Sequence, residues 1–321
     1  GRVLAVKGAL PMLITAAESG NMKEILLPEE NCAEASLVAA RAGINLIPVK
    51  SLKEAACHIA GGNIGSYKGS FPLRTADLPD FADVKGHSAA KAAIAAAMAG
   101  AGKTMLAKRA PGLLPPMSLE EQMEASAVYS AAGLLGEDMP IVMSRPFRQI
   151  SAPVTKAQLL GGGNGPSPGE VSFAHKGVLF ADEMLEMPVR TLESLREPME
   201  ERQVRLIRRG MVNVFPADFI FIGATNPCRC GFLGDPVHRC TCSQTEIEKY
   251  RSRLSGPLAD RIDMCIEIQR ADYGEMKGER TQSTCQLRRM VEAAGKIQDM
   301  RFEGREFSRN SRMNERDVEE F

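Results

Sequence analysis

Short apolar stretches alternate with amphipathic segments through the first 60 residues. The pattern predicts, in chain order, a strand, a helix, a strand, a helix and a strand at residues 3–6, 9–19, 24–27, 34–42 and 45–49. Strands that alternate with helices in this way favour a partly parallel sheet. Since the first predicted strand begins almost at residue 1, we expect this unit to be the second half of a larger domain.

Three further regions differ in pattern. Residues 61–80 are rich in Gly, Pro and polar residues without periodicity, which is typical of a linker. Residues 81–270 contain two continuous apolar runs, 177–181 and 219–224, which we interpret as central strands buried on both faces. Residues 271–321 are charged and helical, with the clearest helix predicted at 282–301.

Composition excludes several classes of protein. Forty basic residues balance forty acidic ones, so the chain is not coated with positive charge for nucleic acid, although a local basic patch is compatible with this balance. No stretch approaches the roughly 18 consecutive apolar residues of a membrane span, and no secretory signal is visible. Four of the eight cysteines lie within fifteen positions. We therefore expect a cytoplasmic protein with one metal site and no membrane contact.

A glycine-rich segment has the residues needed to bind a triphosphate. Gly100 and Gly102 would let backbone N–H groups approach phosphate oxygens, Lys103 would reach the outer phosphates of ATP, and Thr104 would hold Mg²⁺. The match to a P-loop is incomplete, because Ala97 stands at the first glycine position and an Ala-rich stretch replaces the leading strand. Either the segment is not a P-loop, or, as we favour, about ten residues of the usual P-loop arrangement are missing between positions 98 and 102.

Polar residues follow both apolar runs. Asp182 and Glu183 end the first, an arrangement in which Asp182 binds Mg²⁺ and Glu183 polarises the attacking water. Asn226 follows the second and could orient that water. The alternatives are solvated carboxylates at a strand end and a turn residue before Pro227.

Arg261 is the candidate arginine that reaches into a neighbouring subunit and stabilises the charge on the transferred phosphoryl group. The alternative is a surface ion pair with Asp260 or Asp263, worth at most about 1 kcal/mol.

The clustered cysteines form two Cys-x-Cys pairs, separated by nine residues on a turn-rich stretch: Cys228, Cys230, Cys240 and Cys242. Four thiolates satisfy tetrahedral Zn²⁺ and leave no open position, so the expected zinc is structural. Disulfides or free thiols are the alternatives, and His238 is a possible substitute ligand.

The densest basic cluster lies on two predicted strands around Gly210 and consists of Arg202, Arg205, Arg208 and Arg209. These side chains could contact a phosphate backbone without reading bases. Equally, the hairpin could be solvated, with its arginines paired to Glu197, Glu200 and Glu201.

The order of these motifs resembles an AAA+ ATPase of the magnesium-chelatase-like branch, and in detail the ComM/YifB-type family. The resemblance covers nearly the whole chain and rests on residues 107–116 (AKRAPGLLPP), 161–163 (GGG), 168–171 (PGEV), 174–180 (AHKGVLF), 192–196 (LESLR), 226–231 (NPCRCG) and 253–263 (RLSGPLADRID).

The resemblance implies an α/β fold: a P-loop NTPase core with a parallel sheet at residues 81–270, a partial Lon-protease-like domain at 1–60 and a partial helical lid at 271–321. Leu10 stands where Lon carries its catalytic lysine, and Lys7 is out of register, so the first domain is expected to be non-proteolytic.

The resemblance also implies how the protein works. It points to a homo-oligomeric ring, expected to be a hexamer, whose arginine-rich hairpin faces the central pore. The implied activity is Mg²⁺-dependent ATP hydrolysis on single-stranded or branched DNA, as a helicase or in branch migration during recombination or natural transformation. The alternatives are a chelatase-like ATPase that remodels a partner protein, and an ATP-binding scaffold with weak turnover.

Overall fold

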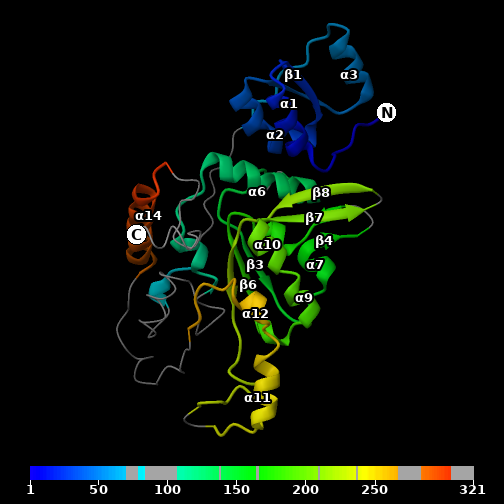
Figure 1. Ribbon diagram of the computed structural model, residues 1–321. Coiled ribbons are helices and arrows are strands. Elements are labelled where there is room, and N and C mark those ends of the chain that lie inside the picture. The colour runs from blue at the N-terminus through cyan, green and yellow to red at the C-terminus, as the bar shows by residue number, and fades with distance from the viewer. Residues whose placement is uncertain are drawn as a thin grey trace.

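A computed structural model describes residues 1–69, 79–83, 107–136, 139–163, 166–208, 210–235, 238–266 and 283–304. Figure 1 shows an N-terminal unit at one end of the molecule, next to the long helix α6 (Leu119–Ala132) of a larger α/β core. None of the helices in these ranges is long and apolar enough to cross a membrane.

The N-terminal unit contains a two-stranded parallel sheet between helices. Its elements are α1 (Ala9–Glu18), β1 (Glu24–Pro28), α2 (Glu29–Ala42), β2 (Asn45–Val49) and α3 (Leu52–Ile59). The helices and strands predicted between residues 9 and 49 are therefore present, with α2 starting five residues earlier than expected. Leu10 is 1% exposed and packs with Leu13, Val38 and Leu46 in the core of this unit, so it has the environment of a structural residue.

The prediction of a strand at residues 3–6 is wrong, because the structure has no strand there. The N–H of Val6 donates to Asn31 Oδ1 and its carbonyl accepts from Asn31 Nδ2, both at 2.9 Å. The N–H of Ala5 donates to the Glu30 carboxylate at 3.1 Å. Side chains from the first turn of α2 thus bond the backbone groups that a neighbouring strand would need, and only Arg2 forms an isolated bridge, with Ser51.

Helix α6 (Leu119–Ala132) carries the contact between the N-terminal unit and the core. The helix begins with a capping box between Ser118 and Glu121 and ends at Gly133, whose φ of 73° suits glycine. Buried Ser130 accepts from Gly8 through its carbonyl at 2.8 Å and from Leu10 through its hydroxyl at 3.2 Å. The start of α1 is therefore held directly on α6.

The core is built on a parallel sheet of order β3-β6-β9 (Phe147–Ile150, Val178–Ala181 and Ile220–Gly223). Its register aligns Ile150 with Ala181, and Ala181 with Gly223. All four residues of β6 are fully buried, as the sequence predicted for a central strand. The parallel sheet confirms the predicted α/β core.

The two faces of β6 contact separate apolar clusters. Leu179 and Ala181 pack in a cluster with residues of the following turns and helices, and Val178 and Phe180 pack on the opposite face. The elements around the sheet are η1 (Phe81–Asp83), η2 (Ala110–Leu113), α7 (Lys156–Leu160), β4 (Gly161–Gly162), β5 (Ser167–Pro168), α8 (Glu170–Phe173), η3 (Met184–Glu186), α9 (Val189–Glu193), α10 (Arg196–Glu201), α11 (Gln244–Arg251) and α12 (Gly256–Ala259).

The prediction that the second apolar run is buried on both faces is wrong for β9. Ile220 is 37% exposed and Gly223 is exposed, although Ile222 is buried. Within the described ranges β9 pairs only with β6, and no described strand covers its other edge.

Two more predicted elements are present. Helix α14 (Thr284–Arg301) packs on the second face through fully buried Leu287, and Arg288 Nε donates to Gly112 O at 2.7 Å. The strands around Gly210 form the antiparallel hairpin of β7 (Gln203–Arg208) and β8 (Met211–Pro216), which projects from the core beneath the N-terminal unit (Figure 1).

Candidate functional site

The carboxyl ends of β6 and β9 lie side by side, as expected for parallel neighbours. Backbone hydrogen bonds continue past both strands: Asp182 N donates to Ile150 O at 2.9 Å, and Ala224 N donates to Ala181 O at 2.8 Å. Met184 N then donates to Ala224 O, also at 2.8 Å. The residues that follow these strands, which include the predicted Asp182, Glu183 and Asn226, are therefore held at one edge of the sheet.

Glu183 has an unusual backbone conformation. Its φ of 47° and ψ of 45° lie in the left-handed region, which costs a non-glycine residue roughly 1–2 kcal/mol. The neighbouring carboxylate supports the turn, because Asp182 Oδ1 accepts from Glu183 N at 3.1 Å. The turn leaves the Glu183 carboxylate exposed and Asp182 half-buried. Strain of this kind accumulates at functional sites.

The tip of β9 is held by a tyrosine that the sequence did not single out. The hydroxyl oxygens of Thr225 and Tyr250 lie 3.4 Å apart, and Thr225 Oγ1 also donates to Asn226 O at 3.2 Å. Asn226 itself is half-buried at the sheet edge. Together, the strand tips supply two carboxylates, a hydroxyl and an amide, which are groups able to hold a cation and orient a water molecule.

The predicted phosphate-binding residues Gly100, Gly102, Lys103 and Thr104 lie outside the described residues, as does the break predicted between positions 98 and 102. Their distance from Asp182 therefore stays a prediction.

Arg261 forms an ion pair, but with neither aspartate considered from the sequence. Its NH2 lies 2.8 Å from the carboxylate of Glu200 on α10, and its NH1 donates to Pro257 O at 3.3 Å. The side chain is 31% exposed. Glu200 is close to Arg261 only in the folded chain, which is why neighbours in sequence suggested Asp260 and Asp263.

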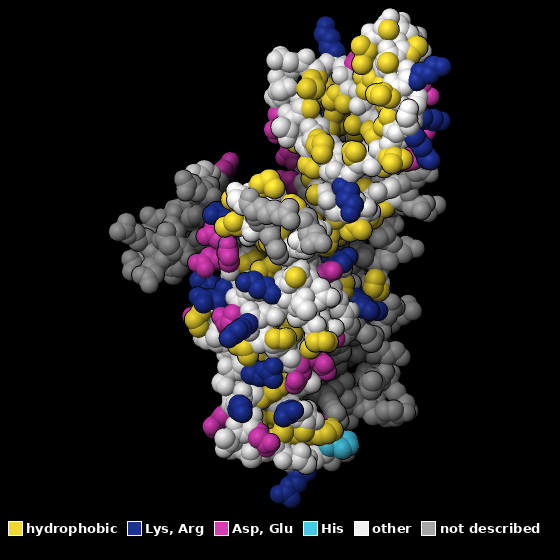
Figure 2. All heavy atoms as spheres, turned by 90° about the vertical axis from the view of Figure 1, so that its right-hand side faces the viewer, with side chains coloured by type: hydrophobic (Ala, Val, Ile, Leu, Met, Phe, Trp, Pro, Cys, Tyr) yellow, Lys and Arg dark blue, Asp and Glu magenta, His cyan; other side chains and the backbone are white. Residues whose placement is uncertain are grey.

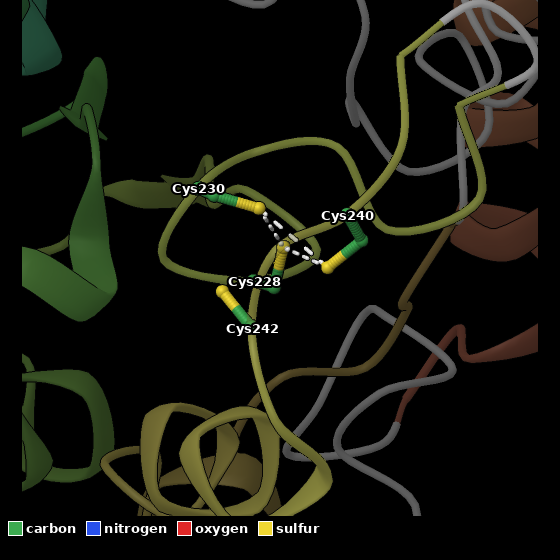
Figure 3. A group of neighbouring side chains, drawn as sticks. All are labelled: Cys228, Cys230, Cys240 and Cys242. Atoms are coloured by element: carbon green, nitrogen blue, oxygen red, sulfur yellow. Dashed lines mark hydrogen bonds between the residues drawn. The ribbon is translucent and has the colours of Figure 1, made fainter.

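The four clustered cysteines converge on one point (Figure 3). Their Sγ atoms all lie within 4.8 Å of one another, with 3.4 Å between Cys228 and Cys230, 3.7 Å between Cys228 and Cys240, and 3.5 Å between Cys230 and Cys240. Tetrahedral Zn²⁺ with Zn–S bonds of about 2.3 Å separates its sulfurs by about 3.8 Å. None of the four thiols forms a disulfide, so four sulfur ligands at a spacing that fits Zn²⁺ are present.

The protonation of these thiols shows why a cation suits them. Hydrogen bonds from the backbone N–H groups of Phe232 and Thr241 lower the pKa of the Cys230 thiol to about 5. The backbone N–H of Cys242 also lowers the pKa of Cys240, but burial and the neighbouring thiols Cys230 and Cys228 raise it to about 12. One thiolate therefore opposes ionisation of the next, and a bound divalent cation would offset that repulsion.

The two hairpin arginines whose side chains the structure describes, Arg202 and Arg205, form no ion pair with the glutamates considered from the sequence. Arg202 NH1 lies 2.6 Å from Asp218 Oδ1, just beyond β8. Arg205 is exposed on the strand, whereas the side chain of Arg208 and all of Arg209 lie outside the described residues. The face that carries Arg205 also exposes three apolar side chains that the sequence analysis did not emphasise: Ile207, Val212 and Val214 at 72%, 59% and 51%.

A polar network, also missed from the sequence, joins the base of this hairpin to α6. His175 is 3% exposed; its Nδ1 accepts from Asp218 N at 3.0 Å, and its Nε2 lies 3.1 Å from Glu124 Oε2. Lys176 Nζ bridges Glu124 and Asp218 at 3.1 and 3.2 Å. Since Nδ1 is an acceptor, His175 is a neutral imidazole whose Nε2–H donates to Glu124.

Burial lowers the pKa of His175, chiefly by disfavouring the imidazolium. Below about pH 6.5 the unfolded chain binds a proton at this residue that the folded chain does not, so we expect the free energy of unfolding to fall as pH decreases from 7 towards 5. Burial also raises the pKa of Asp218, but Arg202 and Lys176 hold it below its ordinary value, so Asp218 stays charged over this range.

Urea denaturation of the wild type and of H175N between pH 5 and 8 tests this expectation. Asparagine can accept a hydrogen bond from Asp218 N in place of the His175 Nδ1, but it does not titrate. The free energy of unfolding of the variant should therefore change less steeply with pH between pH 5 and 7. Identical slopes in the two proteins would contradict the assignment.

Comparison with known proteins agrees with this architecture. The family profile of magnesium chelatase, subunit ChlI, matches residues 80–276, more than half of the chain. The chain is 38% identical over 97% of its length to an uncharacterized protein of Mycobacterium tuberculosis, of which it covers 63%. It is 33% identical over 96% to the uncharacterized protein YifB of Salmonella typhimurium, covering 64% of that protein. It is also 31% identical over 99% to the competence protein ComM of Haemophilus influenzae, covering 66%.

The chain thus spans slightly less than two thirds of the length of these relatives. The relatives match almost all of it, whereas the family profile covers the region that holds the parallel sheet, its polar strand tips and the cysteine cluster. The chain belongs to the magnesium-chelatase ChlI family of AAA+ proteins and is of the ComM/YifB type.

Proposed function

We propose that the chain is the motor portion of a ring-forming, Mg²⁺-dependent ATPase that acts on DNA. The observation that carries this proposal is the convergence of Asp182, Glu183 and Asn226 at the carboxyl edge of neighbouring parallel strands. In this scheme Asp182 helps to hold Mg²⁺, Glu183 takes a proton from the attacking water, and Asn226 orients that water.

The phosphate-binding segment completes the proposed site. The backbone of Gly100 and Gly102 and the side chain of Lys103 would hold the phosphates of ATP, and Thr104 would share Mg²⁺ with Asp182. This placement calls for a parallel strand along the far edge of β9, where the described residues supply none, and such a strand would end beside the existing strand tips.

Ring assembly follows from the proposed role of Arg261. A guanidinium supplied by a neighbouring subunit would stabilise charge on the transferred phosphoryl group, so the active form would be a homo-oligomer, which we propose to be a hexamer. Arg261 is only partly buried and its partner Glu200 is exposed, so the pair can separate at little cost.

The remaining units have proposed roles as well. Residues 1–60 would be the non-proteolytic part of a Lon-like domain, residues 61–80 a linker, residues 81–270 the ATPase core and residues 271–321 part of a lid. The four cysteines would hold a structural Zn²⁺ that braces the stretch between Asn226 and α11.

The basic hairpin and the name of one relative, competence protein ComM, support DNA as the substrate. Figure 2 shows Lys and Arg side chains at several places on the face from which the hairpin projects. A hairpin that exposes Arg205, with Arg208 and Arg209 close to it in the sequence, could bind phosphates without reading bases. This contact suits a helicase or branch-migration motor on single-stranded or branched DNA.

Loss of the hairpin arginines tests this proposal. We expect single-stranded and branched DNA to stimulate ATP hydrolysis by the wild type, and R205A/R208A to lose that stimulation while its DNA-free rate is unchanged. A plot of the logarithm of the DNA-binding constant against the logarithm of salt concentration has a negative slope, and the magnitude of that slope should fall by about one for each lost phosphate contact. ATPase assays and binding titrations at several salt concentrations measure both effects.

A matched control separates the hairpin from general charge. R289A/K296A removes two positive charges from exposed positions on α14 and should keep DNA stimulation. K103A should abolish hydrolysis with and without DNA. Equal stimulation of wild type and R205A/R208A would contradict the DNA contact.

The family itself favours a second candidate, an ATPase that remodels a partner protein. The exposed apolar residues Ile207, Val212 and Val214 suit a protein surface better than a phosphate backbone. Stimulation of ATP hydrolysis by a protein partner and not by DNA would favour this candidate, and nucleotide binding without turnover would favour a scaffold.

A further inference from the structure

The segment between α11 and α12 is anchored in the core beneath the strand tips. Tyr250 is 5% exposed and Leu258 is fully buried, and both pack in the apolar cluster that contains Met184, Leu185 and Met187. Met184 and Leu185 lie in η3, and Met187 is the residue that ends it. Glu183 is the residue that begins the same turn. Residues 250–258 therefore share an apolar cluster with the turn that carries the proposed catalytic carboxylate.

Tyr250 also reaches the second strand tip. Its hydroxyl lies 3.4 Å from Thr225 Oγ1, next to Asn226. Burial raises the pKa of Tyr250, opposed by its hydrogen bonds with Thr225 and with the backbone of Asn226, so the phenol remains a neutral hydrogen-bonding group. The end of α11 is thus connected to the tip of β9 by a polar contact inside an otherwise apolar environment.

Arg253 makes the corresponding contact with η3. Its NH2 donates to Met187 O at 3.0 Å and, more weakly, to Glu186 O at 3.5 Å. Its Nε is buried and has no hydrogen-bond partner among the described residues, so the two carbonyls contact the guanidinium through NH2. Arg253 therefore holds the far end of the turn whose near end is Glu183.

The same segment continues directly to Arg261. Ser255 caps α12 by accepting from Leu258 N at 3.3 Å, and its hydroxyl also bonds to the carboxylate of Glu193 on α9. Arg261 N donates to Leu258 O at 3.1 Å, one turn after that buried leucine. A short, well-packed path of backbone thus joins both strand tips to the arginine proposed to act on a neighbouring subunit.

We propose that residues 250–261 form a strut in which Tyr250 and Arg253 are positioning residues, coupling the arrangement of Glu183 and Asn226 in one subunit to the Arg261 that it offers to the next. This inference rests on the proposed ATPase function. A shift of either strand tip on nucleotide turnover would move Arg261, so hydrolysis around the ring would be cooperative.

Removal of the Tyr250 hydroxyl tests the strut without opening a cavity. Because errors near 1 Å in positioning cost up to about 100-fold in rate, we expect Y250F to lower kcat by about 10-fold or more. KM for ATP should be unchanged, and the Hill coefficient should fall towards 1. R253M should behave in the same way, and R253K, which keeps a charged donor, should retain more activity.

Y129F is the matched control. Tyr129 is 8% exposed on α6, and its hydroxyl donates to Phe173 O at 3.0 Å and is also hydrogen-bonded to Arg148, so this variant likewise removes a buried hydroxyl, on a helix that carries none of the strand-tip residues. It should lose stability as Y250F does but keep wild-type kcat and cooperativity. Wild-type kinetics in folded Y250F and R253M, or equal losses in Y129F, would overturn the strut. A wild type that hydrolyses no ATP would instead refute the proposed function, and the strut with it.

Discussion

Replacement of Glu183 by glutamine is expected to lower the rate of ATP hydrolysis by about 10²–10⁴-fold, the usual contribution of a positioned general base. Glutamine has nearly the same size as glutamate and can occupy the same left-handed backbone conformation, so the substitution removes the charge and leaves the turn at η3 in place. ATP affinity should be close to that of the wild type, since Glu183 is proposed to contact the water and not the nucleotide. Steady-state hydrolysis and equilibrium binding of ATP by the assembled protein measure the two effects.

The appropriate control is E186Q, the same substitution three residues later on the same turn. Glu186 contributes a backbone carbonyl to Arg253, which the substitution preserves, so hydrolysis should change little. If E183Q hydrolysed ATP as fast as the wild type, Glu183 would not be the base, and a scaffold role would become the better explanation.

Removal of zinc is expected to have the largest effect on stability. Structural Zn²⁺ contributes on the order of 10 kcal/mol to the ordering of small cysteine-bound units, and the stretch between Asn226 and α11 has little apolar core of its own. The purified protein should contain one Zn²⁺ per chain, measured by elemental analysis, and C240S should lose it. Amide hydrogen exchange should then rise through residues 227–243, the stretch that carries all four ligands and the N-cap Ser243.

Variants of cysteines outside the cluster provide the comparison. Cys57 and Cys285 are exposed and free, so C57S and C285S should keep both the zinc and the exchange protection. A wild type without stoichiometric metal, whose four clustered thiols react freely with a thiol reagent while the protein is folded, would refute the zinc site.

The two sites are adjacent along the chain. The cysteine stretch begins two residues after Asn226 and leads into α11, whose last turn includes Tyr250, the residue that touches Thr225. Loss of zinc should therefore reduce ATP hydrolysis as well as stability, through the position of Tyr250 and Asn226.

Local patterns explain which parts of the fold were predictable. The apolar run at 178–181 is buried on both faces, and the cysteine spacing indicated a four-sulfur site whose atoms do converge. The same reasoning was wrong for residues 3–6, where Asn31 takes the backbone groups of Val6. It also overestimated the burial of β9, because an apolar run does not show how far neighbouring elements cover a strand.

The sequence by itself determined the order of strands and helices between residues 9 and 49, the polar residues at the ends of β6 and β9 and the two cysteine pairs, since side-chain periodicity and turn preferences act between near neighbours. Only the tertiary structure decided that Arg261 pairs with Glu200, that Tyr250 reaches Thr225, and that His175 is held between Glu124 and Asp218. These partners lie 25 to 61 residues apart, and their contacts depend on how helices pack against the sheet, which no local pattern specifies.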